Sequence, residues 1–80
     1  MREANDEPEG DYTNCFKVGY TPVEFLLDFG QAYDVSAPAL YRTRLVIAPA
    51  YAKVLSSMLR QSLDAYELAH GTIPEIATHD

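Results

Sequence analysis

The sequence has little cysteine, little positive charge and no long hydrophobic run. Its single cysteine, Cys15, excludes an internal disulfide framework and favours a reducing compartment, so we expect a cytoplasmic protein. No apolar run approaches about 18 residues and no charged segment precedes a hydrophobic one, so we expect neither a membrane span nor a signal peptide. Six basic residues against twelve acidic ones form no basic stripe, so nucleic acid is not an expected partner.

The negative charge is concentrated near the N-terminus. Of the net charge of −6, residues 1–11 contribute −4 through one arginine and five carboxylates. Pro8 and Gly10 interrupt this segment, and it contains too few apolar residues to order itself. We therefore expect a disordered acidic tail over residues 1–11, a single domain over residues 12–76 and a frayed end over residues 77–80.

Three segments alternate their side chains as strands do. They cover residues 12–20, 23–31 and 41–47, with a loop rich in turn formers over residues 31–39. The short Thr21-Pro22 corner favours an antiparallel hairpin between the first two. The side chains expected on one face of each segment are, in chain order, Tyr12, Phe16, Val18 and Tyr20; Val23, Phe25, Leu27 and Phe29; Tyr41, Thr43, Leu45 and Ile47.

From Pro49 the apolar residues change to a helical period. Pro49 presets the φ of a first helical turn and cannot continue a strand ladder. Gly71 supplies the left-handed conformation that ends a helix, and Pro74 prevents the helix from resuming. The apolar stripe, at steps of three and four residues, contains Tyr51, Ala52, Leu55, Met58, Leu59, Ser62, Leu63, Tyr66 and Ala69.

The order of these segments predicts an α+β fold, namely a three-stranded antiparallel β-meander followed by one long C-terminal α-helix that packs across one face of the sheet. Eighty residues bury only about 60% of their unfolded surface, and one small sheet cannot cover the whole helix stripe together with its own outward apolar side chains. We therefore expect self-association as a homodimer or a higher oligomer. The residues expected at its interface are Leu26, Val46, Leu55, Met58, Leu59, Leu63 and Tyr66.

Four charged residues are expected to face outward on the second and third strands. Glu24 and Asp28 alternate along one strand, and Arg42 and Arg44 alternate along the next. Opposite charges on adjacent strands predict cross-strand ion pairs, which fix the register of a sheet. We interpret this charge cluster as structural rather than functional.

The sequence contains no recognisable catalytic constellation. His70 ends the helix, where imidazole is a common cap, and His79 lies near the end of the chain. Neither histidine has a cysteine or carboxylate at a metal-ligand spacing, and Cys15 has no histidine near it in sequence. We therefore expect no enzymatic activity, no cofactor and no metal site.

Several short strings resemble those of a family of small, mostly bacterial and archaeal domains of unknown function. The strings are YTN at 12–14, EFLLDFG at 24–30, RLV at 44–46, PAYAKVL at 49–55 and YELAHGTI at 66–73. Thr13 replaces a usual alanine, and Ala48 stands where a serine often provides the helix N-cap, which costs about 1 kcal/mol. The resemblance implies a shared fold but assigns no activity.

These features favour a non-enzymatic oligomeric interaction module. A meander followed by a long helix in an acidic oligomer is similar in outline to the SecB-type export chaperones, so a holdase or adaptor that binds an extended peptide is an alternative. A further alternative is a small-molecule sensor that uses the loop over residues 31–39, with Tyr33 and Tyr41 lining its pocket.

Overall fold

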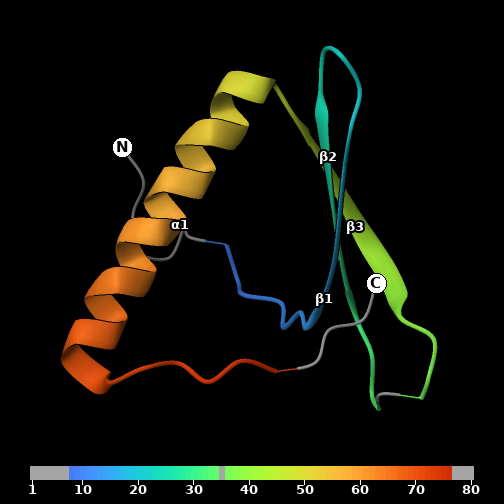
Figure 1. Cartoon of the computed structure of the whole chain (residues 1–80). Coiled ribbons are helices and arrows are strands. Elements are labelled where there is room, and N and C mark those ends of the chain that lie inside the picture. Colours follow the sequence, from blue (N-terminus) through green and yellow to red (C-terminus); the bar gives the residue numbers. More distant parts are fainter. Residues whose placement is uncertain (1–7, 35, 77–80) are drawn as a thin grey trace.

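The computed structural model describes residues 8–34 and 36–76 (Figure 1). Three strands, β1 (Cys15–Tyr20), β2 (Phe25–Gln31) and β3 (Leu40–Ile47), form one antiparallel sheet in sequence order, and helix α1 (Pro49–His70) follows. The predicted α+β meander with one C-terminal helix is confirmed, and dimerisation stays a prediction. Residues 1–7 of the expected tail and the expected frayed end over residues 77–80 lie outside the described residues.

The hairpin of β1 and β2 places six of its large apolar side chains on one face of the sheet. Phe16 lies opposite Phe29, Val18 opposite Leu27, and Tyr20 opposite Phe25. At the corner the Thr21 hydroxyl oxygen accepts hydrogen bonds from the backbone N–H groups of Val23 and Glu24, at 3.2 and 3.1 Å. This local bond gives the turn its shape without a glycine.

The ladder of β2 and β3 contains a bulge that the alternation did not predict. Asp28 pairs with Arg44 and Phe29 with Thr43, but Gly30 pairs with Tyr41, so Arg42 is the extra residue. Tyr41 is thereby turned to the face of Lys17, whose Nζ lies 5.0 Å from the centre of the Tyr41 ring. The expectation that Tyr41 shares a face with Thr43, Leu45 and Ile47 is wrong for this reason.

Gly30 is required where the backbone of β3 comes close to β2 at the bulge. A Cβ atom on Gly30 would lie only 2.1 Å from the Leu40 carbonyl oxygen and 2.8 Å from the Tyr41 Cα. These neighbours are backbone atoms, which cannot rotate away as a side chain can. The glycine therefore serves the close approach of two chains rather than a special φ angle.

Asn14 extends the sheet beyond the N-terminal end of β1. Its side-chain Nδ2 donates to the Ala32 carbonyl and its Oδ1 accepts from the Ala32 N–H, both at 2.9 Å. The Thr13 hydroxyl donates to the Gly30 carbonyl at 2.7 Å. An amide side chain thus substitutes for a rung of the backbone ladder, which accounts for β1 beginning at Cys15 rather than at Tyr12.

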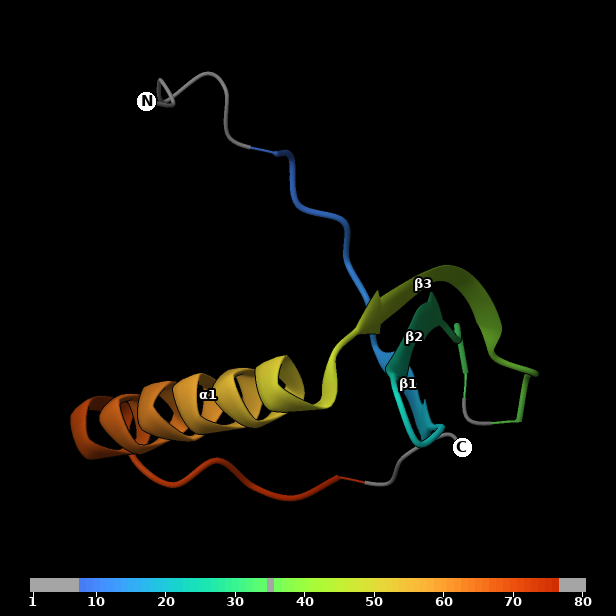
Figure 2. The ribbon, with the colours of Figure 1, turned by 90° about the horizontal axis from the view of Figure 1, so that it is seen from above.

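Helix α1 begins and ends as its sequence predicts. The Ala48 carbonyl accepts from the N–H groups of Tyr51 and Ala52 without any side-chain cap, and Pro49 occupies the first turn. Gly71 adopts φ +98° and donates to the Glu67 carbonyl at 2.9 Å. The Glu67 carboxylate also accepts from the Ile73 N–H at 2.8 Å, and the chain then turns from the end of the helix back toward the sheet (Figures 1 and 2).

Helix α1 does not pack across the sheet, which corrects the prediction that it covers one face. In the described part of the chain, extensive contacts between elements are made among the three strands alone, and no residue of α1 is buried. Figures 1 and 2 show the helix extending away from the sheet after the corner at the end of β3. The reason is the corner itself, because a proline at Pro49 keeps Ala48 extended, at φ −69° and ψ 150°.

The two strand glycines provide a matched test of the close approach at Gly30. We expect Gly30→Ala to lower the free energy of unfolding by about 1–3 kcal/mol, because the methyl group overlaps backbone atoms. We expect Gly19→Ala, whose Cβ meets nothing within 4 Å, to change it by less than about 0.5 kcal/mol. Urea denaturation at one fixed chain concentration measures both, and equal effects would contradict the assignment.

Candidate functional site

Eight apolar side chains cover one face of the sheet, which we call the apolar face. It consists of Phe16, Val18, Tyr20, Phe25, Leu27, Phe29, Leu45 and Ile47. Phe16 and Phe29 meet edge to face with ring centres 6.0 Å apart, and Tyr20 lies 5.7 Å from Phe25. Even so, Val18 remains 67% exposed and Tyr20 76% exposed. The face is organised like a core, but nothing in the described chain covers it.

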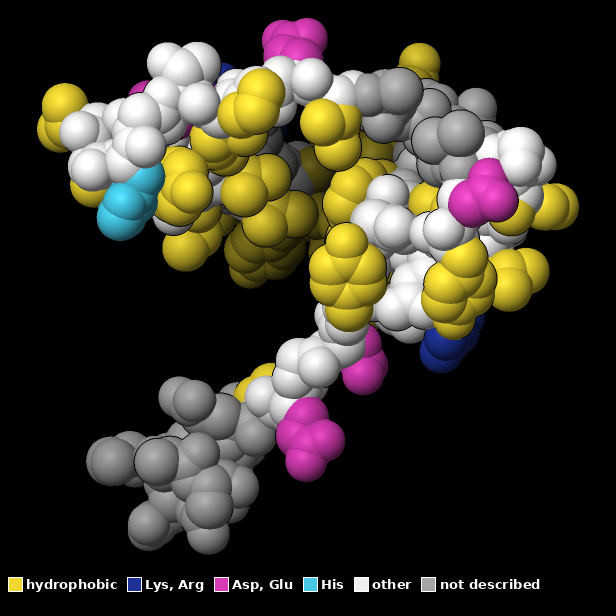
Figure 3. All heavy atoms as spheres, turned by 90° about the horizontal axis from the view of Figure 1, so that it is seen from below, with side chains coloured by type: hydrophobic (Ala, Val, Ile, Leu, Met, Phe, Trp, Pro, Cys, Tyr) yellow, Lys and Arg dark blue, Asp and Glu magenta, His cyan; other side chains and the backbone are white. Residues whose placement is uncertain are grey.

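A second uncovered apolar surface runs along the helix, which we call the helix stripe. It consists of Tyr51, Leu55, Met58, Leu59, Leu63 and Tyr66. Ile73 of the returning segment borders its C-terminal half, where a shallow groove of about 300 Å³ lies between Leu59, Leu63 and Tyr66. Figure 3 shows hydrophobic side chains gathered on the helix and on the sheet on either side of an open space.

The residues predicted to form a dimer interface lie on two separate surfaces. Leu55, Met58, Leu59, Leu63 and Tyr66 belong to the helix stripe.

Leu26 and Val46, the other two predicted interface residues, face each other across β2 and β3 on the side opposite the apolar face. The predicted interface omits the apolar face because the same prediction places the chain's own helix over that face. The signal that could have found it is the Ala48-Pro49 corner, which restricts the direction in which the helix leaves β3.

On the opposite face a charged row crosses the three strands. Lys17, Asp28 and Arg44 are successive partners in the ladder. Arg44 donates from Nε to Asp28 Oδ1 at 2.7 Å and from Nη2 to Oδ2 at 2.9 Å, a bidentate ion pair. Asp28 is buried while Arg44 remains exposed to solvent. This row holds the register of the sheet from its centre.

The ion pair shifts the ionisation of both partners. The hydrogen bonds from Arg44 lower the pKa of Asp28, the positive charges of Arg44 and Lys17 lower it further, and partial desolvation opposes them. The same hydrogen bonds raise the pKa of Arg44. Asp28 therefore stays ionised across the physiological range and acts as a fixed structural anion.

The other two residues of the predicted charge cluster lie apart from this pair. Glu24 belongs to the turn before β2, where its carbonyl accepts from the Thr21 N–H at 2.9 Å. Arg42 is displaced by the bulge and does not share the ladder row of Asp28. The structure thus brings Asp28 and Arg44 together and places Glu24 and Arg42 elsewhere.

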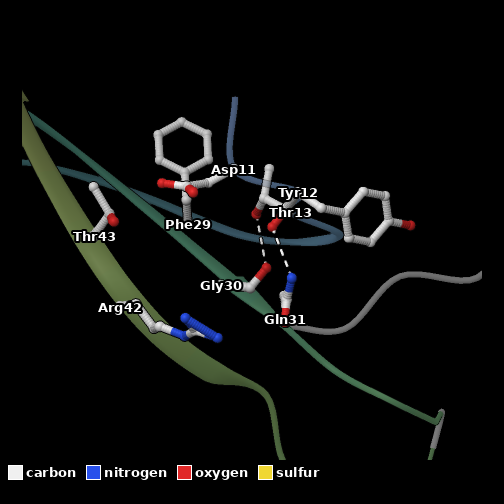
Figure 4. A pocket seen from close by; sticks show the side chains of 8 residues that line it. All are labelled: Asp11, Tyr12, Thr13, Phe29, Gly30, Gln31, Arg42 and Thr43. Atoms are coloured by element: carbon white, nitrogen blue, oxygen red, sulfur yellow. Dashed lines mark hydrogen bonds between the residues drawn. The ribbon is translucent and has the colours of Figure 1, made fainter. Parts of the chain in front are cut away.

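Arg42 lines a pocket of about 310 Å³ at the end of the sheet (Figure 4). The other walls come from the segment before β1, from the end of β2 and from β3: Asp11, Tyr12, Thr13, Phe29, Gly30, Gln31 and Thr43. Gln31 Nε2 donates to the Tyr12 carbonyl at 2.9 Å, and the Thr13 hydroxyl is bonded to Gly30. Two of the polar groups in the wall are therefore engaged in holding the chain together.

Cys15 and His70 occupy structural positions. Cys15 is 1% exposed, and its Sγ lies 3.5 Å from Asn14 Oδ1. The His70 ring packs on Tyr66 with centres 4.8 Å apart. Among residues 8–34 and 36–76, no three His, Cys, Asp or Glu side chains gather as a metal site would need.

No helix within the same described ranges is both long and apolar enough to cross a bilayer.

In the loop before β3, Asp34 Oδ1 accepts from the Ser36 N–H and hydroxyl at 2.6 and 2.7 Å. These bonds form a local turn of the kind that aspartate favours.

Asp28→Asn tests the anion at the centre of the sheet. Because the folded chain lowers the pKa of Asp28, the carboxylate stabilises the fold above its usual pKa of 3.8, and this contribution is lost as pH falls through the lowered value. We expect the wild type to unfold at a higher urea concentration than Asp28→Asn near pH 7, and the difference to shrink below about pH 4.

The matched control is Asp64→Asn. Asp64 pairs with Arg60 one helical turn away at 3.2 Å, and both side chains are exposed. Such a surface pair contributes about 0.5 kcal/mol or less. A stability difference for Asp28→Asn that stays constant from neutral pH to strongly acidic pH would contradict the role of the Asp28 charge.

Comparison with known proteins identifies the family of the chain. Neither a curated protein nor a solved structure matches it. The model of a family described as a protein of unknown function, DUF3467, matches residues 3–75, which include all three strands and the helix. The chain therefore belongs to the DUF3467 family, for which no activity is described.

Proposed function

We propose that this protein is a non-enzymatic interaction module that acts as a homodimer in a reducing compartment such as the cytoplasm. The observation that carries the proposal is the lack of a core within one chain. Of the apolar side chains in residues 8–34 and 36–76, only Cys15 and Ala32 are buried. Soluble monomers rarely expose so much contiguous apolar surface, so a second copy is the simplest cover.

The surface area of the chain agrees with this proposal. The chain exposes 7164 Å². A compact monomer of its 8.9 kDa mass would expose roughly 4,800 Å². Part of the excess surface area belongs to residues 8–14 and 71–76, which are part of no strand or helix. A stable interface removes roughly 1,200–2,000 Å² over both partners, which is roughly 600–1,000 Å² from each chain. The excess is large enough to include this area.

Light scattering on dilute protein tests the homodimer. We expect a mass twice that of the chain at micromolar concentration and a loss of that mass in Leu59→Glu, because the charge falls in the middle of the helix stripe. Leu59 is 57% exposed in one chain, so the loss of contacts within that chain would not by itself explain a loss of the dimeric mass.

Gln61→Glu is the matched control for Leu59→Glu. Gln61 lies on the same helix, about 200° around its axis from Leu59, and is exposed. We expect this variant to keep the dimeric mass. A folded wild-type monomer would remove the proposal. A Leu59→Glu protein that retains both its fold and its dimeric mass would exclude the helix stripe from the interface.

A second candidate function is that of an adaptor or holdase that takes an extended peptide. The observation that favours it is the sheet order, because β1 and β3 are the two edge strands of the sheet and an edge strand is where an extended peptide can add. Hydrogen–deuterium exchange of the full chain, with and without a chemically denatured client protein, tests it. Added protection confined to β1 or β3 would support a peptide site, and unchanged exchange would remove it.

A further inference from the structure

The apolar face and one helix match each other in width. Three neighbouring strands span about 10 Å between the outer two, and an α-helix with its side chains is about 10–12 Å across. A helix of 22 residues runs about 33 Å, which is longer than the eight residues of β3. One helix therefore covers one apolar face, and each chain carries one of each.

The charges of the strands and of the helix are arranged so that these two surfaces can meet. Lys17, Asp28 and Arg44 all lie on the sheet face opposite the apolar face. The charged residues of α1 lie about 80° or more around the axis from Leu59: Lys53, Arg60, Asp64 and Glu67. Packing the helix stripe on the apolar face therefore buries apolar groups and leaves the charged row of the sheet outside the contact.

The helix of the same chain is held away from its own sheet. A single residue, Ala48, separates β3 from α1, and the ring of Pro49 restricts Ala48 to extended backbone. Ala48 has φ −69° and ψ 150°, and the helix leaves the sheet at this corner (Figures 1 and 2). A corner of one residue followed by a proline has little freedom with which to fold the helix back.

We propose that helix α1 of each chain lies on the apolar face of a second copy, so that two copies exchange helices. The exchange is reciprocal, and a two-fold axis relates the two helix-on-sheet contacts. This inference rests on the proposed homodimer and specifies its interface. It differs from a dimer that pairs helix with helix or sheet with sheet, because each chain supplies the surface that the other chain lacks.

Complementation between two full-length variants tests the exchange. Leu45→Glu places a charge on the apolar face, and Leu59→Lys places one on the helix stripe. In a homodimer of either variant, both helix-on-sheet contacts contain the introduced charge. In an equal mixture, a mixed dimer keeps one intact contact, between the unaltered helix of Leu45→Glu and the unaltered sheet of Leu59→Lys. Its other contact brings the introduced glutamate near the introduced lysine.

We expect each variant alone to lose the dimeric mass in light scattering, either as a monomer or with loss of its fold. We expect the mixture to recover a dimer, and native mass spectrometry to show one chain of each kind. The dissociation constant of the mixed dimer should be at least about tenfold lower than that of either variant alone. Recovery of helical circular dichroism on mixing gives the same answer if the single variants do not fold.

The matched controls are Val46→Glu and Gln61→Lys. Val46 is 53% exposed and Leu45 49% exposed, but these neighbours point to opposite faces of β3. Both control variants should keep the dimeric mass. A dimer lost in Val46→Glu but kept in Leu45→Glu would place the interface on the other face and overturn the exchange.

The remaining outcomes separate this inference from the proposed function. A wild-type monomer would overturn both. A wild-type dimer that only Leu59→Lys dissociates indicates helix-to-helix contact, and one that only Leu45→Glu dissociates indicates sheet-to-sheet contact. Either result, or a mixture that forms no mixed dimer, overturns the helix exchange and leaves the homodimer intact.

Discussion

The steric clash between a proline ring and the residue before it determines which surfaces of this chain can meet. At the corner after β3 it keeps Ala48 extended, so α1 starts at once and runs away from the sheet that precedes it. A longer or more flexible connection would let the helix fold back and give a small monomer with its own core. With one residue and a proline, two apolar surfaces of the same chain remain apart and uncovered.

The sheet is held by interactions at its ends and centre rather than by a core. Asn14 and Thr13 fasten the start of β1 to the end of β2 through side-chain bonds to the backbone. Gly30 admits the backbone of β3 at the bulge, and Asp28 binds Arg44 across the ladder. These contacts are polar and directional, so they specify the register while the apolar face contributes little burial within one chain. Such a sheet is suited to form its core with a partner.

The two faces of the sheet differ in chemistry, and this difference limits what the protein can do. One face carries aromatic and aliphatic side chains, and the other carries the charged row of Lys17, Asp28 and Arg44. The buried thiol of Cys15 and the ring contact of His70 leave both groups in structural surroundings. These surfaces are the basis of the proposed interaction module, because specificity in such a module arises from shape and burial.

The local elements and their order follow from the sequence alone. Alternation in residues 15–31, the helical period after Pro49 and the positive φ of Gly71 depend on neighbouring residues alone, so periodicity and steric rules predicted them well. The tertiary structure decided where surfaces lie. One extra residue at Arg42 moved Tyr41 to the other face, and the corner at Ala48 kept the helix off the sheet. Both depend on how distant backbones approach each other, which a periodic pattern along one chain does not record.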